Sequence, residues 1–308
     1  TWIGHAHLGL VRRRMGALAE AEARYRTAIE IIETEYGPLH PDLFTLRGNL
    51  GNVLFDRGQR KAALQQFERA LEAIDGASER DNLRRVMLLV RIGATHMMLG
   101  ELDQAEPRYQ QALETLRRMD AMGGVIAAEA MHNYALLEQR RGHIDRAVSL
   151  YEGALEIRRE LDGQRQATVN TLINLGVIES ERGRLEQAEA WARQALALAT
   201  EHFPEAGPVR ADAEGAMGKV LLRRGRPEQS LRHLERALAS QRSLEAPAHE
   251  RARLVLWIAR ARTANDEARD RVRPAVEEAL REVRAMPEPD RKLEGELVTW
   301  IEGGSGVP

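Results

Sequence analysis

Residues 49–73 read NLGNVLFDRGQRKAALQQFERALEA, and residues 174–198 read NLGVIESERGRLEQAEAWARQALAL. Both stretches carry a Leu-Gly pair, a second glycine seven residues later, and alanines at fixed distances after that glycine. The same spacing occurs six times in the 308 residues of the chain, at intervals of 41 or 42 residues. The small residues that open these copies are Gly9, Gly51, Gly93, Ala135, Gly176 and Gly218. A repeat of this length predicts an array of similar structural units.

Each copy is predicted to fold as a helical hairpin. Its second glycine predicts the end of the first helix, because glycine adopts the left-handed C-terminal conformation without steric cost. These glycines are Gly16, Gly58, Gly100, Gly142, Gly183 and Gly225. Small, bulky and small residues then follow at i, i+4 and i+7, as in Ala63, Phe67 and Ala70, and mark one face of a second helix. Such a hairpin buries its apolar face by stacking on its neighbours.

The pattern resembles the tetratricopeptide repeat (TPR), whose Leu-Gly pair appears here as Leu8-Gly9, Leu50-Gly51, Ile92-Gly93, Tyr134-Ala135, Leu175-Gly176 and Met217-Gly218. The 42-residue period and the opening Leu39-His40-Pro41-Asp42 are similar to the kinesin light chain subtype. The resemblance implies an all-α, right-handed α-solenoid of TPR hairpins with a degenerate C-terminal cap. We expect hairpins over residues 2–43, 44–85, 86–127, 128–168, 169–210 and 211–251, a degenerate capping pair over 252–286, and a terminal helix and tail over 287–308.

Composition excludes several classes of function. Lys and Arg total 45 against 47 for Asp and Glu, so no basic field exists to attract nucleic acid or an anionic membrane. No apolar run approaches the ~18 residues of a membrane span, and the N-terminus lacks a secretory pattern, so we expect a cytoplasmic protein. The chain starts without Met, and we expect it to be part of something longer.

The sequence offers no catalytic constellation. There is no cysteine, and the nine histidines are dispersed, so no metal site is predicted. Residues 215–219 read GAMGK, but a phosphate loop needs four residues between its glycines and Ser or Thr after the lysine. We therefore expect no enzyme activity, no catalytic residue and no cofactor in this chain.

The expected binding surface is the concave face of the stack, which the first helices of the hairpins line. Asparagine is a poor residue in the middle of a helix, yet it recurs at one position of this face. The members of this series are Asn49, Asn133 and Asn174, with Asn52 and Asn170 beside them. A carboxamide both donates and accepts hydrogen bonds, so it can pair with both halves of a peptide group. The alternatives are asparagines that bond within their own groove, or a relic of the repeat.

Cations are a second, weaker feature of the same face. Arginines precede most turns, where a helix C-terminus favours positive charge, and this explains most of them. Arg91, Arg140, Lys219 and Arg223 complete the predicted groove, where arginines could pair with partner carboxylates. We interpret Met87, Met98 and Trp257 as core or cap packing.

Taken together, these patterns predict a non-catalytic scaffold that binds a protein or an extended peptide in its groove. The strong preference for Arg over Lys is associated with bacterial coding, so we expect a bacterial signalling protein. The alternative is the C-terminal sensory or recruiting arm of a multidomain enzyme: a serine/threonine kinase first, then a signalling ATPase or a caspase-like protease. Residues 256–262 and 296–300 loosely resemble the repeat regions at the ends of bacterial serine/threonine kinases. Self-association through the uncapped first hairpin is left open.

Overall fold

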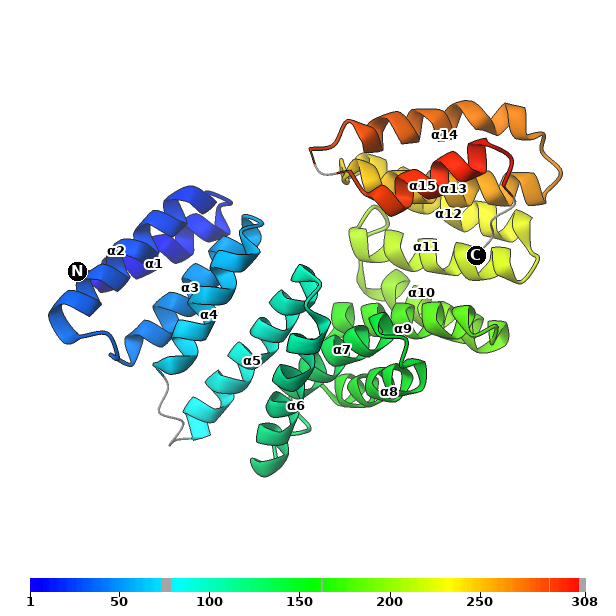
Figure 1. The fold of residues 1–308 in the computed structure, drawn as a ribbon. Coiled ribbons are helices and arrows are strands. Elements are labelled where there is room, and N and C mark those ends of the chain that lie inside the picture. Colours follow the sequence, from blue (N-terminus) through cyan, green and yellow to red (C-terminus); the bar gives the residue numbers. More distant parts are fainter. Residues whose placement is uncertain (74–78, 162, 288, 305–308) are drawn as a thin grey trace. The chain divides into compact units, whose positions relative to one another are not determined.

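The computed structural model describes residues 1–73, 79–161, 163–287 and 289–304. All regular secondary structure in these ranges is α-helical (Figure 1), which confirms the predicted all-α class. The helices are α1 (Trp2–Arg14), α2 (Leu18–Tyr36), α3 (Asp42–Asp56), α4 (Arg60–Glu72), α5 (Glu79–Leu99), α6 (Leu102–Arg118), α7 (Val125–Arg140), α8 (Ile144–Glu160), α9 (Arg165–Glu181), α10 (Leu185–His202), α11 (Pro208–Arg223), α12 (Pro227–Ser243), α13 (Ala248–Ala264), α14 (Arg269–Arg284) and α15 (Arg291–Ile301).

The chain forms two compact units, residues 1–157 and 158–308, whose boundary lies near the end of α8. In the first unit α1 packs on α2, α3 on α4, and α5 on α6; in the second α9 packs on α10, α11 on α12, and α13 on α14. Helix α15 packs on α13 and α14. The eight repeat boundaries derived from the sequence stay predictions, and residues 305–308 of the predicted tail lie outside the described residues.

The turn glycines end the first helices as predicted. All six adopt left-handed backbone conformations, with φ between 69° and 80°. The N–H of the next residue donates to a carbonyl five residues back, for example Gln59 to Leu54 at 2.9 Å and Arg226 to Leu221 at 3.0 Å. In the degenerate unit Asp266 takes the same place with φ 61°, and Glu267 donates to Arg262 at 3.0 Å. The turn is therefore retained where the glycine is not.

The mid-helix glycines admit the bulky residue of the second helix. A Cβ added at Gly51 would lie 2.5 Å from the Phe67 ring, and one added at Gly218 would lie 2.6 Å from Leu234. Where the bulky residue is replaced by Ala192, the space is larger, and a Cβ on Gly176 would meet its nearest atom at 3.4 Å. Gly51 and Gly218 thus leave room for a large side chain, whereas Gly176 has space to spare.

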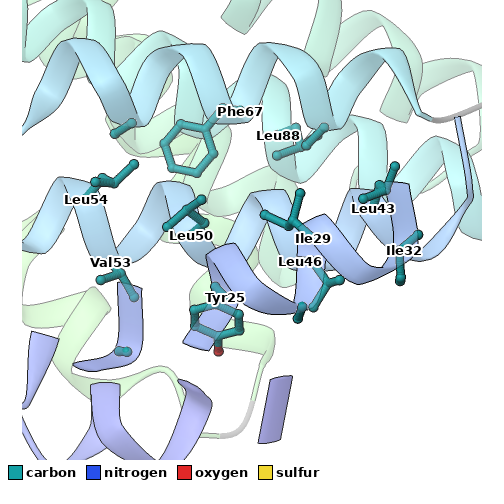
Figure 2. Close-up of a cluster of buried hydrophobic side chains, with 14 of the residues drawn as sticks. Tyr25, Ile29, Ile32, Leu43, Leu46, Leu50, Val53, Leu54, Phe67 and Leu88 are labelled. Carbon is teal, nitrogen blue, oxygen red and sulfur yellow. The ribbon is translucent and has the colours of Figure 1, made fainter. Parts of the chain in front are cut away.

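A continuous apolar cluster fills the first hairpins (Figure 2). Phe67 of α4 points toward Leu50 of α3, and Tyr25 of α2 lies below them in the view. These three side chains are at most 1% exposed, and small residues such as Ala63 belong to the same cluster. Burial of this apolar surface is the main force that holds neighbouring hairpins together.

Arginines at the C-caps of first helices contact the preceding hairpin. Arg57 pairs with Glu22, Arg141 with Glu106, and Arg224 with Glu189, in each case 35 residues earlier. We call these three pairs the inter-hairpin clasps. The helix dipole alone is therefore an incomplete explanation of the arginines, because at these positions they also join one hairpin to the next.

Candidate partner-binding face

The first unit carries five of the predicted groove residues on α3, α5 and α7. Asn49, Asn52 and Asn133 are half-buried, and Arg91 and Arg140 are exposed. Within the described ranges, the side chains of the three asparagines make no hydrogen bond to another residue. The alternative of asparagines that bond inside their own groove therefore does not apply to these three positions.

The remaining side chains of this surface differ in how they are held. Arg140 donates to the carbonyl oxygen of Met97 at 3.1 Å, which fixes its stem against the preceding first helix. Met87 and Met98 are 54% and 44% exposed, so the expectation that they pack in the core is wrong. They lie on α5 at the register positions of the predicted groove, which gives this surface an apolar component.

The second unit carries the other four predicted residues on α9 and α11. Asn170 is exposed and Asn174 is half-buried, and Asn174 interacts with another group of the chain. Lys219 and Arg223 follow on α11, one turn apart. Arg223 donates from Nη1 to the Ser180 hydroxyl at 2.8 Å, while its Nε is buried without a hydrogen-bond partner among the described residues.

Lys219 and Arg223 line a pocket of about 330 Å³ between α9, α11, α13 and the start of α15. We call it the Lys219 pocket. Arg253 and Trp257 of α13 line it as well, together with Glu296 of α15. A second cavity of about 630 Å³ shares Lys219 and Arg253 with the first, so two hollows meet at these cations.

Burial is the main influence on the charged groups of the Lys219 pocket, which is lined by four cations and three carboxylates. Burial lowers the pKa of Lys219, and the nearby cations of Arg253 and Arg223 lower it further, against the opposing effect of Asp212. Burial likewise raises the pKa of Asp212, with a further contribution from Glu250. In both groups the charged form is disfavoured, because burial removes it from water.

Two pocket residues were missed as site residues by the sequence analysis. Trp257 was expected to be cap packing; it does pack against the core, but it also lines the pocket, between the guanidinium groups of Arg223 and Arg260 at 5.7 and 5.0 Å from the ring centroid. Arg253 lies 41 residues after Asp212, and Trp257 lies 41 residues after Ala216. Extending the repeat register by one unit would therefore have found both.

No helix in the described ranges has the length and apolar character to cross a membrane. Nor does this part of the chain bring three His, Asp or Glu side chains together in a way that could hold a metal ion.

The chain is similar to repeat proteins of several organisms. It is 28% identical over 144 residues to a TPR repeat-containing protein of Synechococcus elongatus, covering 47% of this chain and about a third (33%) of that relative. A putative kinesin light chain of Podosopora anserina with nearly identical TPR-like repeats has a TM-score of 0.57 at 16% identity, covering 67% of this chain and 98% of that one. A signal transduction ATPase with numerous domains (STAND) and a tetratricopeptide repeat sensor, from Pyrococcus horikoshii, has a TM-score of 0.67 at 14% identity, covering 99% of this chain and 45% of that one.

Family models agree with these similarities and with the geometry. The model of the MalT-like TPR region matches residues 70–287, and a tetratricopeptide repeat model matches residues 3–75. The hairpins, the turn glycines and the stacked cores described above are those of a TPR solenoid. The chain belongs to the tetratricopeptide repeat family.

Proposed function

We propose that this chain is a non-catalytic scaffold that binds a protein or an extended peptide on the face made by its first helices. One observation carries the proposal: Asn49, Asn52 and Asn133 make no hydrogen bond within the described residues, although each is half-buried on that face. A helix gains nothing from asparagine at these positions, since alanine is the better helix former. A carboxamide pairs with a peptide N–H and a peptide C=O together, which suits an extended backbone of varied sequence.

We further propose that the scaffold works within a larger bacterial signalling protein. The structural neighbour from Pyrococcus horikoshii supports the signalling part of this context, because its tetratricopeptide repeat sensor belongs to a longer signalling ATPase, 45% of which is covered by this chain. Within the alternative of a sensory arm of a multidomain enzyme, this neighbour favours a signalling ATPase over the serine/threonine kinase ranked first from the sequence. A caspase-like protease has no comparable support.

The test is capture of partners by the intact chain and by one double variant. Asn49→Ala with Asn133→Ala removes two carboxamides from the first unit and leaves the second unit unchanged. Each hydrogen bond lost to a desolvated peptide group is worth about 0.5–1.5 kcal/mol, so partner affinity should fall roughly tenfold. The melting temperature should hold or rise slightly, because alanine is the better helix former.

The matched control removes an amide side chain in the same way, but on a second helix. Gln65 is an exposed amide on α4, a second helix, and it makes no hydrogen bond within the described residues. Gln65→Ala should leave partner affinity unchanged in calorimetric titration. Equal affinity in the double asparagine variant and the intact chain would place binding on another surface and refute the proposed role of these residues.

A further inference from the structure

The first-helix face of the second unit already binds two carboxylates of its own chain. Arg253 of α13 contacts Asp290 at 2.6 Å, and Arg260 contacts Glu296 of α15 at 3.7 Å. Asp290 is the N-cap of α15, and Glu296 lies in the middle of that helix. The N-cap and the middle of α15 thus supply carboxylates that neutralise Arg253 and Arg260 of α13.

The two cations of α11 are not neutralised in this way. Within the described ranges, neither Lys219 nor Arg223 forms an ion pair with a carboxylate. Lys219 is half-buried, and Arg223 has a buried Nε with no hydrogen-bond partner in the same ranges. Burying a charge without a partner is costly, so both groups gain when a negative group comes into hydrogen-bond reach.

The walls of the Lys219 pocket are apolar beside these cations. Val177, Val220, Leu256 and Leu293 line it, and its volume of about 330 Å³ is at the lower end of the ~300–1,000 Å³ typical of ligand pockets. A ligand that fills it therefore combines a negative group with aliphatic surface.

We propose that the Lys219 pocket binds an aspartate or glutamate side chain of an extended peptide partner, with a neighbouring aliphatic side chain of that peptide against the apolar walls. This assignment rests on the proposed function and names the chemistry of the partner at one place. The carboxylate accepts hydrogen bonds from the Lys219 ammonium and the Arg223 guanidinium. Trp257, which lies against Arg223, keeps that guanidinium in position.

A carboxylate fits this surface better than a phosphate group. The anions that the face already binds, Asp290 and Glu296, are both carboxylates. Glu181 also lines the pocket and repels a doubly charged phosphate more strongly than a singly charged carboxylate.

The test measures binding of short synthetic peptides to the full chain. The probes are an array of capped heptapeptides with a central Glu or Asp flanked by Leu, Ile or Val. Each has a matched version with Gln or Asn at the centre and another with phosphoserine. The best acidic peptides should bind at least tenfold more tightly than their amide versions in fluorescence polarisation. They should also bind more tightly than the phosphoserine versions.

Variants of the chain assign that preference to the pocket. Lys219→Met keeps the aliphatic stem and removes the charge, and it should reduce the preference for the acidic peptides to less than threefold. Arg223→Gln should act in the same direction. Arg232 is an exposed arginine on α12 without an ion pair in the described ranges, so Arg232→Gln is the charge-matched control and should keep the full preference. Melting curves establish that each variant is folded, and Lys219→Met still tests the proposal where Arg223→Gln fails to fold.

Three outcomes would overturn the inference: equal binding of acidic and amide peptides, an acidic preference that survives Lys219→Met, or tighter binding of the phosphoserine versions. An array in which no peptide binds would overturn it as well. The proposed function fails separately, when the Asn49→Ala and Asn133→Ala variant captures partners as the intact chain does. Capture lost in that variant, with no acidic preference at Lys219, would leave the scaffold function standing without this pocket.

Discussion

The guanidinium of Arg224, the C-cap of α11, contacts the carboxylate of Glu189 on α10, so the end of one hairpin's first helix is fixed to the second helix of the hairpin before it. Arg224 also contacts Glu186 at 2.9 Å. Glu189 is only 4% exposed, which makes this pair less screened than a surface ion pair.

Arg224→Gln should lower the free energy of unfolding by about 1–3 kcal/mol, since hydrogen bonds to charged groups contribute about 1.5–3 kcal/mol and two others remain on Glu189. These remaining contacts come from Arg193 and Arg226. Arg193 is 65% exposed, so Arg193→Gln is the control and should cost under about 0.5 kcal/mol. Urea unfolding of the two variants compares them, and equal losses would mean that the clasp contributes no more than a surface pair.

Gly51→Ala and Gly176→Ala should change stability in opposite directions. Alanine is a better helix former than glycine by about 1 kcal/mol at both sites. At Gly51 the new methyl group would lie 2.5 Å from the Phe67 ring, and overpacking of this kind costs about 1–3 kcal/mol. At Gly176 the nearest atom is 3.4 Å away, so most of the stability gained from the better helix propensity of alanine should remain. Thermal melts check the signs, and a stabilised Gly51→Ala variant would contradict the packing role of that glycine.

Asp266→Gly should stabilise the degenerate C-terminal hairpin. Asp266 has φ 61°, a conformation that costs an L-residue about 1–2 kcal/mol, less for aspartate, and that glycine adopts freely. The expected gain is about 0.5–1 kcal/mol, observed as slower amide exchange in α13 and α14. Gly225→Asp makes the reverse change in the preceding hairpin and should destabilise it. Slower exchange in neither helix would show that the turn carries no strain.

The stability of the C-terminal cap should depend on pH through Asp290. The N–H of Leu293 and the Arg253 guanidinium both hold the pKa of Asp290 below its usual range. A lowered folded-state pKa contributes stability above the unfolded-state pKa of about 3.9, and this stability is lost as the pH falls through the folded value. Urea unfolding at pH 7 and at decreasing pH below 4 should show this loss in the intact chain.

Substitutions at Asp290 separate its charge from its role as a helix cap. Asparagine caps a helix as well as aspartate does, so Asp290→Asn should reduce the pH dependence and keep the cap. Asp290→Ala should lose a further ~1 kcal/mol at all pH values. A pH dependence unchanged in Asp290→Asn would assign the loss to other carboxylates.

The helices, their turns and their packing glycines could be predicted because they follow from local chemistry that repeats. Gly58 ends its helix because the turn needs a left-handed residue at that place of the repeat, and a run such as Ala63, Phe67 and Ala70 has one apolar face in any array. The exposure of Met87 could not be predicted, since it depends on how far a neighbouring hairpin covers α5.

The candidate site was predictable only in part, for a related reason. The register placed Lys219 and Arg223 on the first-helix face, where they line a pocket. The regular register stopped with the hairpin over 211–251, because the next unit has Asp266 where the others have a turn glycine, and the role of Arg253 was therefore missed. The pairing of Arg253 with Asp290 depends on where α15 docks, and no repeat pattern specifies the position of a terminal helix.

The spacing of the three inter-hairpin clasps bears on how the array can be shortened. The clasp glutamates Glu22, Glu106 and Glu189 lie 84 and 83 residues apart, which is two hairpins and not one. At the hairpins between them the same place holds Leu64 and Val148. Removing two successive hairpins keeps each remaining clasp glutamate one hairpin before its arginine, whereas removing one hairpin can set Leu64 or Val148 before a clasp arginine. Shortened versions of the chain should therefore be cut in steps of two.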